Sequence, residues 1–312
     1  MTHSAEGHRL GWIGLGRMGY AMAEQLAKAG FNLKGYNRTR SKAEGLQKAG
    51  VILVDHPSDL SDCDIVFTMV STADDLQSVL DGRNGLFSRP NKAPRILAEL
   101  STISPEASAG IRALAASKGT EMLVVPVSGN DVVARAAKLS VTASGPKPVF
   151  DVLLPYLKCF GPQVTYVGEG EVSRVVKICH NLYLGIVYEG LAEVTLLAEA
   201  HGVPRNLFLQ VINNSVLGST FTRYKTPVIA NLDYTVTFTN TLMRKDLELG
   251  LKAAASAGVS LPATEVVRNI VQACIDEGRA EQDYTVILDK LAQYAGMSLK
   301  PDNAAVTDGL SG

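Results

Sequence analysis

Short apolar runs and amphipathic helical stretches alternate along the first half of the chain. Runs that predict strands lie at Leu10–Ile13, Asn32–Tyr36, Ile65–Val70, Ile96–Glu99, Met122–Val125, Ser140–Ala143 and Val164–Val167. Helical patterns lie among them, at Met18–Ala29 and near Lys42–Ala49. Strands that alternate with helices are typical of βαβ units with a mostly parallel sheet and right-handed crossovers. The first half therefore predicts an α/β domain.

The pattern changes after Gly168. Residues 169–200 contain almost no helix breaker and are rich in Val, Leu, Ala and Glu, which predicts one long helix that is buried on several sides. Gly202-Val203-Pro204 would end this helix. The pattern stays helical over residues 205–295, with turn signals at Pro227, Gly258 and Pro262.

These patterns predict three parts of the chain. Residues 1–168 would form the α/β domain, and residues 169–296 an all-α domain that begins with the long linking helix. The polar segment 297–312 predicts a disordered tail.

Composition narrows the class of protein. Of the 312 residues 46% are hydrophobic and 20% are charged, with a formal net charge of −1, so nothing favours a nucleic-acid or membrane partner. No apolar run approaches the roughly 20 residues that span a bilayer. Cys63, Cys159, Cys179 and Cys274 are far apart, and the polar start Met1–His8 does not look like a targeting signal. We expect reduced thiols in a cytoplasmic protein.

A glycine-rich turn follows the first predicted strand. Gly14-Leu15-Gly16-Arg17-Met18-Gly19 reads G-x-G-x-x-G and lies between that strand and a helix. The first glycine permits a tight turn, the second lets backbone approach a pyrophosphate, and the third lets helix and strand pack closely. The helix N-terminus would offer N–H groups and a positive dipole end to the phosphate. The motif in this place predicts a Rossmann-type dinucleotide-binding domain.

The end of the second predicted strand bears on the choice of cofactor. An acidic residue there would accept hydrogen bonds from a ribose hydroxyl, but the sequence has Asn37-Arg38-Thr39, with Lys42 close behind. A neutral residue followed by Arg favours the 2′-phosphate of NADP, so NADP is expected rather than NAD. The alternative is that Arg38 is a solvated surface residue.

Four further segments point to one family. Glu99-Leu100-Ser101-Thr102-Ile103-Ser104-Pro105 and Pro126-Val127-Ser128-Gly129 each follow a predicted strand. Gly168-Glu169-Gly170 leads into the helix with Lys177 and Asn181, and Phe238 precedes Lys245-Asp246-Leu247. Together with the glycine-rich turn, these segments resemble the β-hydroxyacid dehydrogenase family, which includes 3-hydroxyisobutyrate dehydrogenase, tartronate semialdehyde reductase and glyoxylate/succinic semialdehyde reductase. The resemblance extends from Leu10 to about Ala295.

The resemblance implies an NAD(P)-dependent oxidoreductase for a small 3-hydroxy acid or its semialdehyde or keto acid, assembled as a homodimer or homotetramer. It makes Lys177 the catalytic acid/base and places Asn181 in the same pocket. It assigns Ser128 and Gly129 to the substrate carboxylate, and Thr102 to the vicinity of nicotinamide and substrate. Lys245 would contact the cofactor, with Asp246 its neighbour and Phe238 a wall of the substrate pocket. Val70, Ser71 and Thr72 would pass over the adenine-side ribose and phosphates.

The chemistry of Lys177 supports this assignment. Hydride transfer from an alcohol carbon requires removal of the hydroxyl proton, and the reverse reaction requires a proton for the developing alkoxide. In Val175-Val176-Lys177-Ile178 the lysine lies on an apolar helix, where desolvation would lower a lysine pKa toward the working range. The alternative is a lysine whose amine extends to solvent.

The sequence departs from the family pattern at the acid-binding end. Asn130 follows Ser128-Gly129 where the family has glycine, and Val124 replaces an Asp. Later glycine positions read Val133-Ala134 and Ala137-Lys138. Lost glycines reduce close backbone donors, whereas Asn130 adds an amide to the substrate pocket. His180 replaces an Asn; no metal-ligand spacing surrounds it, so we expect a packed helix histidine and no metal site.

One segment has no clear counterpart in the better-known relatives, Phe221-Thr222-Arg223-Tyr224-Lys225. Its cations either reach an acidic substrate or are solvated on a surface helix. Two other functions stay open from the sequence. An imine reductase shares the fold but usually has another residue in place of Lys177. A non-catalytic dinucleotide-binding module would have no need of Lys177, Asn181 and Lys245.

Overall fold

The computed structural model describes residues 7–309, and they form two compact units that divide after Lys177, inside one long helix. The first unit consists of parallel sheet and helices, and the second is helical. The predicted fold class, an α/β Rossmann-type part followed by an all-α part, is confirmed. No helix within residues 7–309 combines the length and the apolar character that crossing a bilayer would need.

A parallel sheet is the centre of the first unit. Its six strands in the described residues follow the order β3-β2-β1-β4-β5-β6. They are β1 (Leu10–Ile13), β2 (Leu33–Tyr36), β3 (Ile52–Leu53), β4 (Ile65–Thr68), β5 (Ile96–Glu99) and β6 (Glu121–Val124). The strand order reverses at β1, where Leu10 is in register with Leu33 of β2 and Ile65 of β4. A crevice at the carboxyl ends of the strands beside such a switch point is where open α/β sheets bind ligands.

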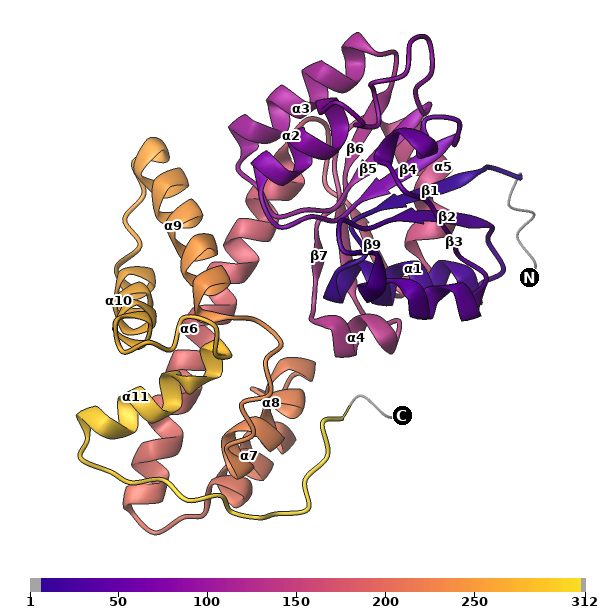
Figure 1. The fold of residues 1–312 in the computed structure, drawn as a ribbon. Coiled ribbons are helices and arrows are strands. Elements are labelled where there is room, and N and C mark those ends of the chain that lie inside the picture. The colour runs from indigo at the N-terminus through magenta and orange to yellow at the C-terminus, as the bar shows by residue number, and fades with distance from the viewer. Residues whose placement is uncertain (1–6, 310–312) are drawn as a thin grey trace. The chain divides into compact units, whose positions relative to one another are not determined.

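Helices cover both faces of this sheet because its strands are apolar on both sides. The helices of the unit are α1 (Arg17–Lys28), α2 (Ala73–Asp81), α3 (Pro105–Ser117), α4 (Asp131–Arg135) and α5 (Lys147–Leu157). Figure 1 shows α2 and α3 on one side of the sheet and α1 on the other. Ile13, Val66 and Leu97 belong to the core that includes residues of α2 and α3. The alternate residues Trp12 and Phe67 stack on each other, with ring centroids 5.3 Å apart.

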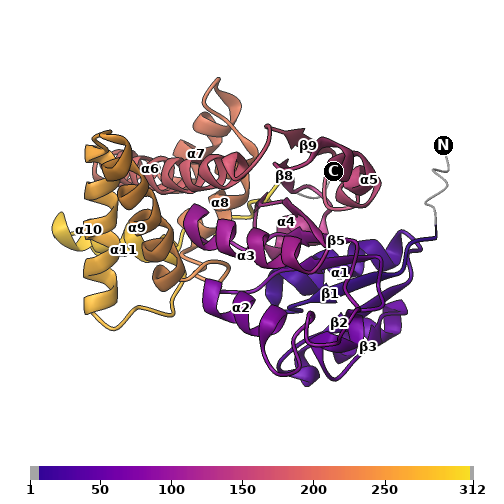
Figure 2. The same ribbon diagram turned by 90° about the horizontal axis from the view of Figure 1, so that it is seen from above.

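Three short strands form a second sheet in the order β7-β8-β9. They are β7 (Val127–Ser128), β8 (Ser140–Ala143) and β9 (Gln163–Tyr166), and β8 and β9 lie beside α5 in Figure 2. An antiparallel bridge between Val124 and Ser144 links the two sheets. The helix predicted near 42–49 is wrong: two 3-10 helices, Arg40–Lys42 and Glu44–Ala49, occupy this segment. Its glycines, Gly45 and Gly50, disfavour a regular α-helix.

The helical unit begins inside α6 (Val172–Ala200), directly after Lys177. The helices that follow are α7 (Arg205–Asn214), α8 (Thr220–Asn231), α9 (Asn240–Ala257), α10 (Pro262–Asp276) and α11 (Ile287–Tyr294). Two more 3-10 helices occur within residues 7–309, Pro57–Leu60 and Tyr284–Val286. The long helix α6 is present as predicted and ends before Gly202, which has φ +84°. It is not buried on several sides, because Tyr183 and Leu197 are 67% and 61% exposed.

The turn predicted at Pro227 is wrong, because Pro227 lies inside α8. The missing N–H of a proline removes one helical hydrogen bond. A capping box fixes the start of this helix: the Ser219 hydroxyl accepts from Thr222 N, and the Thr222 hydroxyl accepts from Ser219 N. Favourable capping and packing therefore outweigh the loss at Pro227.

Lys225 of α8 is buried, so it is neither a solvated surface cation nor an exposed cation directed at a substrate. Its Nζ lies 4.0 Å from Asp283 Oδ1 and 4.9 Å from the centroid of the Tyr284 ring. Burial lowers the pKa of Lys225, while Asp283 opposes that change. Burial also works against the ionised form of Asp283, yet Lys225 and hydrogen bonds from Thr285, Thr237 and Phe238 hold the pKa of this carboxyl below its ordinary value.

The chain after Met297 is fixed to the helical unit, which corrects the predicted disorder over residues 297–309; residues 310–312 lie outside the described part. Arg205 is fully buried and its Nη2 lies 3.2 Å from Asp302 Oδ1. The other carboxylate oxygen of Asp302 accepts from Asn206 N at 2.8 Å. The Asn231 side chain makes two hydrogen bonds with the backbone of Ala304. A polar sequence is therefore ordered because Arg205 provides a buried positive charge for Asp302.

We expect Asp302→Ala to release this segment locally. Loss of hydrogen bonds that involve a charged group, each worth about 1.5–3 kcal/mol, should raise hydrogen-exchange rates of the 298–309 amides by about ten-fold or more. Mass-spectrometric hydrogen exchange measures this, with Thr307→Ala, an exposed residue of the same segment, as the control. Equal exchange in both variants would contradict a tail that Asp302 holds.

Candidate active site

The glycine-rich turn joins β1 to α1 and is shaped by close backbone contacts. Gly14 has φ +91°, and a Cβ on it would lie 2.2 Å from the Met69 carbonyl oxygen. A Cβ on Gly19 would lie 1.9 Å from the Gly14 carbonyl oxygen. At Gly16, the N-cap of α1, no side chain caps the helix and a Cβ would meet open space. The uncapped N–H groups at this helix end fit the pyrophosphate of a dinucleotide.

Asn37 holds this turn in place. Its Oδ1 accepts from Leu15 N at 3.0 Å, and its Nδ2 donates to the Thr39 carbonyl at 2.8 Å. Gly14 N donates to the Tyr36 carbonyl at 2.9 Å. Asn37, the neutral residue that was expected to favour NADP, thus connects the end of β2 to the turn between β1 and α1.

A cleft of about 300 Å³ opens beside this turn. Among its lining residues are several that the sequence predicted as cofactor ligands: Gly14, Gly16, Asn37, Arg38, Thr39, Val70 and Ser71. Leu15 and Arg17 line a neighbouring hollow with Lys42 and Arg135. Thr72 is the N-cap of α2 and accepts from Asp75 N. The cleft therefore lies where the sequence placed the dinucleotide.

Asp75, to which no motif in the sequence pointed, also lines this cleft. Its Oδ1 lies 3.0 Å from Nη1 of Arg38, whose side chain is 84% exposed. The segments that carry the two residues lie far apart in the chain, so spacing gave no signal for the pair.

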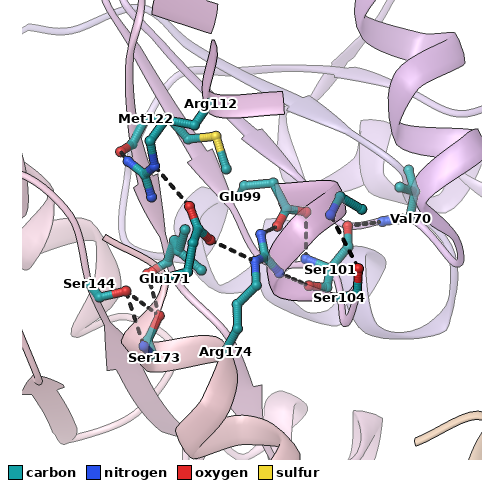
Figure 3. A network of polar contacts seen from close by, with 12 residues as sticks. Val70, Glu99, Ser101, Ser104, Arg112, Met122, Ser144, Glu171, Ser173 and Arg174 are labelled. Carbon is teal, nitrogen blue, oxygen red and sulfur yellow. Dashed lines mark hydrogen bonds and ion pairs between the residues drawn. The ribbon is translucent and has the colours of Figure 1, made fainter. Parts of the chain in front are cut away.

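A buried network of charges fixes the loop that carries Thr102 (Figure 3). Glu99, at the end of β5, is fully buried; its Oε1 accepts from Ser101 N at 2.7 Å and its Oε2 pairs with Arg174 of α6. Arg174 also donates to the Ser101 carbonyl at 2.7 Å and to Glu171 at 3.2 Å. Glu171 in turn accepts from Arg112 of α3 at 2.8 Å. We refer to Glu99, Arg174, Glu171 and Arg112 as the charge network.

Serine hydroxyls extend the charge network to other strand ends. Ser101 Oγ accepts from Val70 N at 2.9 Å, just after β4. Ser144, just after β8, contacts Ser173 of α6 at 2.7 Å, and Ser173 donates to the Val124 carbonyl at 3.3 Å. The first turns of α6 are therefore fixed to the carboxyl ends of β4, β5 and β6 (Figure 3).

Lys177 is half-buried on α6, one helical turn after Arg174. Its neighbours Val175 and Val176 are 47% and 43% exposed, so the apolar side chains beside it are only partly removed from water. The desolvation of the Lys177 amine stays a prediction. The sequence could not show that these valines lie on the outer side of the helix. What fixes the backbone at Lys177 is the charge network rather than apolar packing around it.

Ser128, Gly129 and Asn130 follow β6 at the predicted acid-binding end. Gly129 has φ +128°, and a Cβ there would lie 2.6 Å from Leu139 Cδ2. Asn130 is the N-cap of α4, and its Oδ1 accepts from Val133 N at 3.0 Å. The amide oxygen of Asn130 thus caps this helix, and its predicted place in the substrate pocket stays a prediction.

Polar residues also gather within the helical unit. Asn181 of α6 is buried and donates to Asp246 Oδ2 at 2.5 Å, while Lys245 Nζ lies 3.6 Å from Asp246 Oδ1. Asp246, predicted to line the substrate pocket, is buried and orients Asn181. Phe238 packs edge-on against Tyr284 at 6.0 Å. The predicted packed histidine is wrong: His180 is exposed, with Nδ1 3.2 Å from Asn181 Oδ1, because its position on α6 faces away from the helical core.

The strand order, the glycine turn and the cleft at the switch point define a dinucleotide-binding protein of the doubly wound α/β class. Comparison with known proteins agrees. Residues 9–168 match the family model of the NAD binding domain of 6-phosphogluconate dehydrogenase. Residues 169–291 match that of the NAD-binding domain of NADP-dependent 3-hydroxyisobutyrate dehydrogenase.

Whole proteins match along most of their length. Mitochondrial 3-hydroxyisobutyrate dehydrogenase of Drosophila melanogaster is 28% identical over 297 residues, which cover 93% of this chain and 91% of that protein. The structure of Mycobacterium tuberculosis 3-hydroxyisobutyrate dehydrogenase with L-serine has a TM-score of 0.77 and 26% identity, covering 91% of this chain and 99% of that one. Psf3 in complex with NADP+ and 2-OPP has a TM-score of 0.80 and 25% identity, with 90% and 99% coverage. This chain belongs to the β-hydroxyacid dehydrogenase family and is an NAD(P)-dependent oxidoreductase.

We expect Arg174→Met to destabilise the protein strongly. Glu99 would stay fully buried without its partner, and removing one partner of a buried ion pair costs about 3–5 kcal/mol. The double variant Glu99→Gln/Arg174→Met should recover part of this loss, because it removes the unpaired charge. Urea unfolding of both variants measures the effect, and Arg83→Met, at an exposed arginine of the same unit, is the control. A cost no larger than that of the control would refute the importance of the pair.

Proposed function

We propose that this protein transfers a hydride between NADP(H) and a small 3-hydroxy acid, or its semialdehyde or keto acid, with Lys177 as general acid/base. The observation that carries the proposal is the placement of Lys177. It lies one turn beyond Arg174, which the charge network connects to the loop that carries Thr102. The turn of α6 before Lys177 and the loop with Thr102 are thus connected by the same buried contacts of Arg174.

The chemistry follows from these residues. The bound nicotinamide supplies or accepts the hydride. In the direction of reduction the Lys177 ammonium donates a proton to the oxygen that becomes the alcohol, and in the direction of oxidation the neutral amine takes that proton. Ser128 and the Gly129 backbone bind the substrate carboxylate, and Thr102 contributes a hydroxyl beside the reacting carbon. The charge on Lys177 also stabilises the developing alkoxide.

Residues of the helical unit have supporting roles in this proposal. Asn181 lies one turn after Lys177 on α6 and hydrogen-bonds the substrate, with its amide oriented by Asp246. Lys245 contacts the cofactor, and Phe238 forms a wall of the substrate pocket. The positions 174, 177 and 181 share one face of a helix, which supports a common purpose for the three polar side chains.

NADP is proposed as the preferred cofactor. Arg38, Thr39 and Lys42 line the cleft at the end of β2, where a 2′-phosphate would need cationic partners. The similar structure of Psf3 is described with NADP+. We also propose a homodimer or homotetramer, which the exposed apolar side chains of the helical unit, among them Tyr183, Leu197 and Val211, support.

A substrate panel tests the reaction class. We expect turnover of short 3-hydroxy acids or the corresponding semialdehydes, faster with NADP(H) than with NAD(H), and none with cyclic imines. The nicotinamide absorbance at 340 nm reports both directions of the reaction. Turnover of imines alone would make the protein an imine reductase. Cofactor binding without turnover across the panel would indicate a non-catalytic binding module.

Replacement of Lys177 tests the mechanism. Lys177→Met should lower kcat by about 10²–10⁴-fold, the usual contribution of acid–base catalysis, and leave NADPH affinity nearly unchanged. Lys177→Arg keeps the charge but cannot give up its proton, so it should be nearly as slow. Lys158→Met, at an exposed lysine at the end of α5, is the control. The proposed role of Lys177 fails if Lys177→Met retains ordinary kcat.

A further inference from the structure

The cofactor cleft holds an acidic residue opposite the cation that is expected to bind a 2′-phosphate. Asp75 of α2 and Arg38, just after β2, both line the cleft and form an ion pair, with Nη1 3.0 Å from Oδ1. Lys42 and Thr39 line the same cleft. Arg40, the next cation in this segment, pairs with Asp55 at 2.8 Å and is absent from the cleft lining.

The Asp75 carboxylate is held in this orientation from its other side. Its Oδ2 accepts from the Thr72 hydroxyl at 3.0 Å, and Thr72 in turn caps the backbone N–H of Asp75. A carboxylate in the first turn of a helix is also stabilised by the helix dipole. The Asp75 carboxylate is therefore held in place in the cleft, whereas the Arg38 side chain is 84% exposed.

Two anions would compete for one guanidinium when a 2′-phosphate binds. The planar fork of an arginine pairs best with a single carboxylate or phosphate group. A phosphomonoester carries about −1.5 to −2 charges at neutral pH, so the fixed Asp75 would repel it as well as retain Arg38. NAD has a neutral 2′-hydroxyl in this place and leaves the Arg38–Asp75 pair undisturbed.

We propose that Asp75 is a specificity-determining residue for the cofactor: it competes with the 2′-phosphate for Arg38 and so restrains the preference for NADP. This inference rests on the proposed function in one respect, the assignment of Arg38 to the 2′-phosphate. It concerns cofactor binding alone and is independent of the substrate and of Lys177.

The test compares Asp75→Asn with Asp74→Asn. Asparagine keeps the shape of Asp75 and an oxygen for the Thr72 hydroxyl, while Asp74 is exposed, lies on the same helix and is absent from the cleft lining. Direct titration should show NADPH affinity about ten-fold higher in Asp75→Asn, the size of one charge interaction a few ångströms away in partly solvated surroundings. NADH affinity should hardly change, and Asp74→Asn should change neither.

Salt separates this effect from a structural one. The gain in NADPH affinity should shrink as ionic strength rises, because the charges lie near solvent. Loss of a helix cap would instead weaken both cofactors at every salt concentration. The proposal would be overturned if the ratio of NADPH to NADH affinity in Asp75→Asn equals the wild-type ratio or falls below it.

Arg38→Leu distinguishes failure of the inference from failure of the cofactor assignment. If Arg38→Leu abolishes the preference for NADPH while Asp75→Asn leaves the ratio unchanged, the assignment stands and the role of Asp75 is refuted. If Arg38→Leu has no effect but Asp75→Asn still raises NADPH affinity, Asp75 repels the phosphate directly and the role given to Arg38 is wrong. If neither variant changes the ratio, both ideas are overturned.

Discussion

The buried pair of Glu99 and Arg174 is the constraint on which the candidate site depends. Both side chains are almost completely removed from water, so each charge loses its hydration and must recover that free energy from protein groups. The partners that achieve this come from separate segments: the Ser101 backbone after β5 and Glu171 at the start of α6. Only the native arrangement of strand ends and helix satisfies all of them together. A shift of α6 by even part of a turn would leave a charge unpaired.

This constraint fixes the part of α6 that carries Lys177, the proposed acid/base. Arg174, Lys177 and Asn181 follow the spacing i, i+3 and i+7, so they lie along one face of the helix. Ile178 and Leu182, one position further on, are buried in the helical core. One face of the helix thus carries the apolar residues that pack in the core, and an adjacent face carries the three polar residues. Since Arg174 fixes the first of the polar positions, the direction in which Lys177 leaves the helix axis follows from helix geometry.

The sequence was sufficient for the features that local chemistry determines. The glycine turn, five of the six strands of the main sheet and the long helix α6 follow from periodicity and from the steric demands of Gly14 and Gly19. The two-residue strand β3 is too short to show a period, and the sequence did not predict it. The sequence could not predict contacts between distant segments, because Glu99 and Arg174 are 75 positions apart and Arg38 and Asp75 are 37 positions apart. One signal was available, because a glutamate that ends a wholly apolar strand requires a buried partner. Nothing in the polar tail indicated that Arg205 would bind Asp302, or that Lys225 would be buried.

The departure from the family pattern at Asn130 has a structural explanation in the capping role of its side chain. An asparagine at an N-cap satisfies a free N–H of the first helical turn, which a glycine cannot do with a side chain. The α4 helix that it begins packs against α1, the helix that follows the phosphate-binding turn. Gly129, where a Cβ would clash and φ is positive, has been retained. Asn130 therefore stabilises the start of α4, while Gly129, in the segment proposed to bind the substrate carboxylate, keeps a conformation that only glycine adopts readily.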